Sequence, residues 1–93
     1  MENYNYENTI DEFIENNQII FFFKHKDKFY GASEDSRLVF AGLKDGTFSK
    51  ESRFIGIELH KNMDEKKEKT FSKNDIKDIK IIDEKDAIKG LTK

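Results

Sequence analysis

The first run of apolar residues along the chain repeats with helical spacing. Ile10, Phe13 and Ile14 fall at positions i, i+3 and i+4, which places them on one side of a helix. Thr9, just before them, is of a residue type that often caps a helix start. The pattern predicts a short amphipathic helix over residues 9–17. Because so short a helix is marginal in water, we expect it to pack against another element.

Residues 19–83 show a different pattern, in which short aromatic and β-branched runs alternate with polar turns. Ile19 to Phe23 is too short for a helix and leads into a polar run, which indicates a buried strand. Asp45-Gly46 is the strongest turn signal, because this pair readily adopts positive φ. We expect strands at residues 19–23, 29–31, 37–43, 53–60 and 76–82, with turns at residues 26–28, 44–46 and 72–75.

The clearest strand alternation is in the segment RFIGIELH. Since side chains along a strand point to opposite faces in turn, Ile55, Ile57 and Leu59 are expected to point to the core. Glu58 and His60 are expected to point to solvent. The alternation therefore predicts a strand with one buried face.

These patterns together predict one α+β domain over residues 1–93. It consists of a helix at about 9–17, a β-rich region over 19–83 and a charged C-terminal tail over 84–93 that can add a frayed helix. The polar residues 61–70 are expected to form a loop or hairpin tip. About five short antiparallel strands close economically into a small barrel of the SH3 or Sm type, and an open sheet covered by the helix is the main alternative.

The segment RFIGIELHKNMDEKKEKTFSKNDIKDIKIID, residues 53–83, resembles the end of a WYL-type domain. Residues 53–56 stand where that family has its Trp-Tyr-Leu triplet, and residues 70–76 stand where it has its closing motif. The triplet itself is absent, and Lys69 stands where the family favours Arg. The resemblance implies an Sm-like barrel, and it carries no ligand-binding residue over to this chain.

Composition indicates a chain that folds. Phe, Ile, Leu and Val together make 25 of 93 residues, above the roughly 20% below which a highly charged chain tends to be disordered. There is no cysteine, so a disulfide framework or a thiolate metal site is excluded. The first eighteen residues contain no Lys or Arg, and no apolar run approaches the length of a membrane span. We expect a cytoplasmic protein that does not bind membranes.

The side chains that support catalysis are scarce. His25 and His60 are the only histidines, they lie on different predicted elements, and no cysteine accompanies them. The chain has no glycine-rich phosphate loop, nucleophile elbow or His-x-x-x-His pair. We therefore expect that the protein is not an enzyme and uses no cofactor and no metal.

The N-terminal segment has the strongest charge asymmetry, because residues 1–18 carry five acidic and no basic side chains although the net charge of the whole chain is only -2. Tyrosines lie among these acids, and rings beside carboxylates suit docking on a basic protein groove. The first hypothesis is therefore a protein-binding module or inhibitor, for example a phage or mobile-element protein of the anti-CRISPR or immunity-protein type. Acids near a helix start also favour the helix dipole without any partner. The candidate protein-binding residues are Tyr4, Tyr6, Glu7, Asp11, Glu12 and Glu15.

A second hypothesis concerns a basic and aromatic stretch in the middle of the chain. Interleaved cations and rings suit single-stranded nucleic acid or a nucleotide ligand, although the pI of about 5.7 is far below the value above 9 typical of phosphate-binding domains. The simpler explanation, which we prefer, is that these lysines form a solvated turn whose charges prevent edge-to-edge strand pairing. A third possibility is a homodimer with Ile19 to Phe23 partly at its interface, so both a monomer and a homodimer are considered. The candidate nucleic-acid-binding residues are Lys24, His25, Lys26, Lys28, Tyr30 and Arg53.

Overall fold

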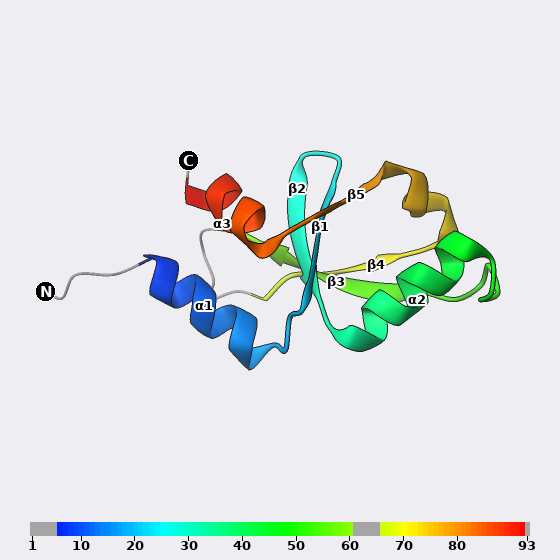
Figure 1. Cartoon of the computed structure of the whole chain (residues 1–93), viewed down its shortest axis with the longest axis horizontal. Helices are drawn as coiled ribbons and strands as arrows, with labels where there is room; N and C mark the ends of the chain where they lie inside the picture. The colour runs from blue at the N-terminus through cyan, green and yellow to red at the C-terminus, as the bar shows by residue number, and fades with distance from the viewer. Residues whose placement is uncertain (1–5, 61–65, 93) are drawn as a thin grey trace, which may run out of the picture.

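The computed structural model of the protein describes residues 6–60 and 66–92 (Figure 1). None of the helices in these two ranges is long and apolar enough to cross a membrane. In chain order, the elements are α1 (Tyr6–Asn16), β1 (Phe21–His25), β2 (Lys28–Ala32), α2 (Glu34–Asp45), β3 (Phe54–Leu59), β4 (Glu68–Phe71), the 3-10 helix η1 (Lys73–Asp78), β5 (Ile79–Ile82) and α3 (Glu84–Thr92).

The strands form one five-stranded antiparallel sheet in the order β4-β3-β2-β1-β5. α2 covers one face, against β3, while α1 and α3 cover the other (Figure 1). The predicted α+β class is confirmed, as is the helix-covered sheet. The predicted closed barrel is wrong, because closure requires the two edge strands to pair. Here η1 carries the chain from β4 at one edge to β5 at the opposite edge.

All three consecutive phenylalanines of β1 are buried, because both faces of the sheet are covered. Successive side chains of a strand point to opposite faces. Phe21 and Phe23 pack in an aromatic core with Phe40 of α2. Phe22 packs on the other face in a second core that includes Ile10 of α1. A strand buried on both faces appears in sequence as a continuous apolar run, and this is the pattern of the segment.

The strand predicted at residues 37–43 is wrong, because this segment lies within the helix α2. Ser33 caps the helix start by accepting a hydrogen bond from a backbone N–H in the first turn, and Gly46 ends the helix with a left-handed φ of 84°. Phe40 and Leu43 are separated by about one helical turn, and both are buried. The glycine of the predicted hairpin turn therefore has positive φ, but it caps a helix.

The N-terminal elements are close to the prediction and differ at their ends. α1 includes Thr9, so this residue is not the helix cap that the pattern predicts. β1 continues to His25 instead of ending at Phe23. The turn between β1 and β2 is confirmed, with Lys26 at a positive φ of 60°.

The C-terminal half contains more secondary structure than predicted. Of the predicted loop at 61–70, residues 61–65 lie outside the described part, and Glu68 to Thr70 belong to β4. The last strand, predicted at residues 76–82, begins only at Ile79, because the turn before it is extended into η1, where Ser72 and Asp75 form a capping box. The charged tail forms the helix α3.

β3 is buried on both faces, whereas the alternation predicted one solvent-exposed face. Ile57 and Leu59 point to the core as predicted. Phe54 and Gly56 are also buried, because they face the aromatic core on the other side of the sheet. Ile55 was expected to point to the core, but its side chain is 46% exposed. It therefore becomes a surface residue of the strand.

Tyr30 gives the fold a measurable pH dependence. Burial, followed by the negative charges of Glu58 and Asp27, raises the pKa of Tyr30 above the ordinary value of 10.0. The folded state therefore holds the phenol proton more tightly than the unfolded state does, and this contribution to stability is present below pH 10.0 and is lost as pH rises above it. Urea unfolding below and above this pH should show a loss of stability that Tyr30→Phe reduces. An equal loss in both proteins would contradict the assignment.

Candidate functional site

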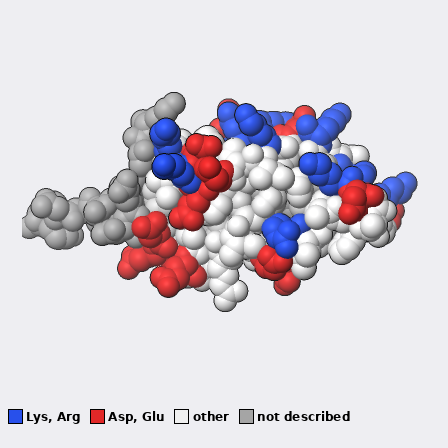
Figure 2. Space-filling model, in the orientation of Figure 1, with Lys and Arg blue, Asp and Glu red and all other residues white. Residues whose placement is uncertain are grey.

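Three carboxylates, Asp11, Glu12 and Glu15, project from α1 into solvent, and we call them the acidic face of α1. Acidic side chains gather over this helix in the space-filling view (Figure 2). Within the described residues, no basic side chain forms an ion pair with any of the three. No ion pair within the described part of the chain therefore neutralises this face.

The fold positions this face through the apolar side of α1. Ile10 is fully buried, and Phe13 and Ile14 pack against the same core as Ala87 of α3. With about 3.6 residues per turn, packing of this stripe turns the intervening acids away from the sheet. Of the other predicted protein-binding residues, Tyr6 and Glu7 belong to α1, and Tyr4 lies outside the described residues.

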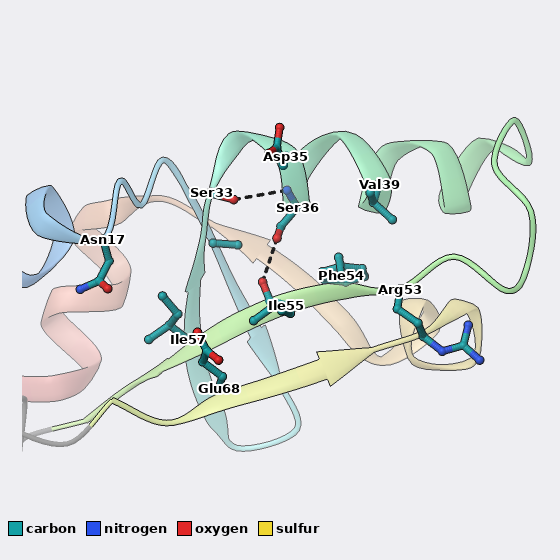
Figure 3. A pocket seen from close by; sticks show the side chains of 11 residues that line it. Asn17, Ser33, Asp35, Ser36, Val39, Arg53, Phe54, Ile55, Ile57 and Glu68 are labelled. Carbon is teal, nitrogen blue, oxygen red and sulfur yellow. Dashed lines mark hydrogen bonds between the residues drawn. The ribbon is translucent and has the colours of Figure 1, made fainter.

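A groove of about 380 Å³ begins at Asn17, directly after α1, and continues between the start of α2 and β3 (Figure 3). We call it the Ile55 groove, because the half-exposed side chain of Ile55 gives it an apolar surface. The Ser36 hydroxyl donates a hydrogen bond of 2.9 Å to the Ile55 carbonyl and so ties α2 to β3. The groove is lined by Asn17, Ala32, Ser33, Asp35, Ser36, Val39, Arg53, Phe54, Ile55, Ile57 and Glu68.

The charged residues of the Ile55 groove are partly neutralised. Arg53 lies at one end, where its guanidinium donates to the carbonyl oxygens of Lys50 (3.1 Å) and Ser52 (3.0 Å) (Figure 3). Glu68 lies 3.6 Å from the ammonium of Lys66, which is itself exposed. Within the described residues, Asp35 has no such partner. The groove thus combines an exposed aliphatic side chain with carboxylates, a combination that the sequence pattern did not reveal.

Strand alternation divides the predicted basic and aromatic stretch: four of its residues line one cleft, whereas Lys24 and Arg53 lie elsewhere. Lys24 points to the face covered by α1 and α3, where its ammonium lies 5.6 Å from the Phe29 ring centroid. Lys28 and Tyr30 point to the α2 face, and Lys28 lies 3.7 Å from Glu58. Tyr30 is only 3% exposed, so its ring is not a platform on which a base could stack. Arg53 lies apart, at the Ile55 groove.

His25 is an internal residue of the fold. Its side chain is buried, with the ring edge-on to Phe71 at a centroid distance of 5.1 Å. Nε2 lies 3.8 Å from the Asp75 carboxylate and has no hydrogen-bond partner within the described part of the chain. His25 thus links β1 to η1.

A second cleft, of about 280 Å³, lies beside the turn between β1 and β2, and we call it the hairpin cleft. Its lysines are interspersed with carboxylates, so the cleft has mixed charge. Among the described residues, no three His, Asp or Glu side chains are grouped closely enough to hold a metal ion. The cleft is lined by His25, Lys26, Asp27, Lys28, Tyr30, Glu58, Lys67, Glu68 and Lys69.

Comparison with known proteins finds no match to a family model, to a curated protein or to a solved structure. The resemblance of residues 53–83 to WYL-type domains stays a prediction. The sheet does not close into the barrel that this resemblance implies.

Proposed function

We propose that the protein is a non-enzymatic protein-binding module that docks the acidic face of α1 on a basic surface of another protein. The observation that carries this proposal is the group of three exposed carboxylates on α1 that no described basic side chain pairs with. Uncompensated charge of one sign speeds and orients the docking of a partner with the opposite sign. A nucleic-acid-processing enzyme, which needs a basic groove for its own substrate, is one partner of this kind, and the protein would then act as its inhibitor.

The Ile55 groove supports the same function, because charge alone gives little affinity in water. Interfaces generally combine an apolar centre with a polar rim. Ile55 provides an exposed aliphatic side chain, and Asp35 adds a further carboxylate. Since the groove begins at Asn17, it directly follows the helix that carries the acidic face. A basic partner with one apolar side chain can engage both features.

Nucleic-acid binding is a second candidate function, favoured by one observation. Lys26, Lys28, Lys67 and Lys69 all line the hairpin cleft. Three carboxylates line it as well, and the ring of Tyr30 is buried, so a nucleic-acid base cannot stack on it. The cleft therefore offers cations without the aromatic platform of a single-strand binder.

Charge reversal separates the two functions. The variant Asp11→Lys/Glu12→Lys/Glu15→Lys should lose capture of its protein partner from nuclease-treated lysate of the native host by roughly tenfold or more, because like charges facing each other cost several kcal/mol. The wild-type capture should also weaken as salt is added. Circular dichroism checks that the variant keeps its helices.

The matched control is Lys24→Ala/Lys26→Ala/Lys28→Ala, which removes three charges of the other sign. This control should capture the same partner as the wild type. Capture that survives reversal of the acidic face would refute the proposal. Binding that the lysine variant loses, and that nuclease abolishes, would assign the nucleic-acid function instead.

A further inference from the structure

The two edges of the sheet differ in how they are protected. An open strand edge is a template for pairing with another chain, and charged side chains are the usual protection against it. β4 carries the exposed charged residues Glu68 and Lys69 along its length. β5 reads Ile-Lys-Ile-Ile, with Lys80 as its one charge, and Ile81 is 52% exposed. β5 is therefore the less protected edge.

The register of the sheet shows which backbone groups of β5 face the open edge. A two-residue loop joins β1 to β2, so the closing pair of His25 and Lys28 exchanges backbone hydrogen bonds. Alternation then turns the N–H and C=O of Lys24 toward β5, where it pairs with Lys80. One residue further along β5, Ile81 therefore directs its N–H and C=O to the open edge.

The end of η1 agrees with this assignment. The N–H of Ile79 bonds to the carbonyl of Ile76 in the cap of η1. Ile79 and Ile81 have the same orientation in the strand, so the backbone N–H and C=O groups of both residues point away from β1. Since the N–H of Ile79 is occupied, Ile81 is the residue of β5 whose N–H and C=O both face the edge without a hydrogen-bond partner among the described residues.

An apolar groove of about 560 Å³ runs beside this edge, between β5 and α2. Its surface is formed mainly by Phe21, Phe40, Ala41 and Ile81. An added strand would place its side chains over this groove while its backbone pairs with β5. The groove and the edge thus form one continuous docking surface.

We propose that β5 pairs in antiparallel fashion with β5 of a second copy of this chain, with Ile81 of one copy opposite Ile81 of the other. A two-fold axis perpendicular to the sheet keeps α2 of both copies on the same face of the extended sheet. Only residues whose side chains point to the same face can then lie opposite each other. Centring the pair on Ile81 lets the two free N–H and C=O groups bond to each other and sets Lys80 opposite Ile82. Centring it on Lys80 would oppose two ammonium groups.

The charges around the groove favour a second copy over a strongly charged partner. Arg37 is held by Glu34 of the same helix through a charged hydrogen bond. Lys44, whose ammonium lies 5.9 Å from the Phe40 ring centroid, is next to Asp45 in the chain. The rim is therefore close to neutral and carries both signs. Such a surface does not repel its own copy across a two-fold axis.

This dimer is independent of the proposed function. β5 pairing extends the sheet at its edge and places the second copy beside α2, whereas α1 packs on the opposite face. The acidic faces of both copies stay exposed, so the dimer would present two of them.

Sedimentation or light scattering of the full chain over a concentration series should show a monomer–dimer equilibrium. Ile81→Lys should shift it to monomer, with a loss of association of tenfold or more, while the matched control Ile55→Lys should leave it unchanged. Ile55 suits this role because it is a similarly exposed isoleucine on a different strand. A dimer that persists in Ile81→Lys would overturn the proposal.

Cross-linking tests the register itself, and the absence of native cysteine gives a clean background. Residues in a hydrogen-bonded antiparallel pair have Cα atoms about 5.5 Å apart, within the range of a disulfide. Under mild oxidation, Ile81→Cys should form a covalent dimer much faster than Ile55→Cys. Equal rates for the two variants would overturn the proposal whatever the mass measurement shows.

Discussion

Replacing Phe23 with Ala is expected to lower the free energy of unfolding by about 3–5 kcal/mol, the usual cost of deleting a buried phenylalanine ring. Phe23 is fully buried at the centre of the aromatic core. Its ring centroid lies 5.2 Å from that of Phe71, 5.4 Å from those of Phe21 and Tyr30, and 6.1 Å from that of Phe54. The free energy of unfolding of a whole small domain is only about 5–15 kcal/mol. The variant should therefore be largely or partly unfolded at modest urea concentrations. Urea denaturation followed by circular dichroism measures the change.

The matched control is Leu38→Ala, which also deletes a large apolar side chain. Leu38 is 48% exposed on α2, and alanine favours a helix. We expect the free energy of unfolding of this control to stay within about 0.5 kcal/mol of the wild-type value, as it usually does for substitutions of exposed residues. A Phe23→Ala variant that is as stable as this control would show that the aromatic core does not hold the sheet together.

The apolar pattern predicted the strand at Phe23 because a run of five aromatic and β-branched residues that ends at a polar turn is too short for a helix. Ile19 to Phe23 was identified as strand, although its end lies at His25. Phe71, an aromatic residue between two polar segments, is likewise fully buried. Long-range pairing leaves no such local mark in the sequence. That η1 carries the chain to the far edge of the sheet, which excludes a barrel, depends on contacts between distant segments.

α2 was missed because RLVFAGL fits a strand as well as a helix. Leu38 and Phe40 alternate like strand residues, and a glycine inside a helix is unfavourable. The structure explains that glycine: a Cβ at Gly42 would lie 2.1 Å from the Phe48 ring, so the helix needs a residue without a side chain there. The decisive signal was the capping residue Ser33 with acids in the first turn, and the strand prediction for residues 37–43 did not take it into account.

The candidate site was predictable only where it depends on one helix. Helical spacing was enough to turn Asp11, Glu12 and Glu15 outward. Exposure of Ile55 could not be predicted, because alternation indicates which face a side chain points to and not whether a helix covers that part of the face. The same limit applies to Lys24 and Tyr30, which the pattern grouped and the two-sided sheet separates.

Gly56→Ala should destabilise the fold by about 1–3 kcal/mol, because it forces an extra methyl group into a packed core. A Cβ at Gly56 would lie 2.8 Å from Cζ of Phe23 and 2.9 Å from Cε2 of Phe71. Both rings are fully buried, so neither can move aside freely. The adjacent substitution Ile55→Val serves as the control for general effects on β3, and it should stay within about 0.5 kcal/mol because Ile55 is half-exposed.

A double-mutant cycle tests whether this clash is the cause. Phe71→Leu removes one of the two rings that the new methyl group meets, at the cost of part of the core packing, and it leaves the contact with Phe23 in place. If the clash dominates, Gly56→Ala combined with Phe71→Leu should be more stable than the sum of the two single changes by roughly 0.5 kcal/mol or more, the range seen for residues in contact. Strictly additive free energies of unfolding would mean that the new methyl group does not clash with the Phe71 ring. That result would contradict the close packing of the aromatic core over the centre of β3.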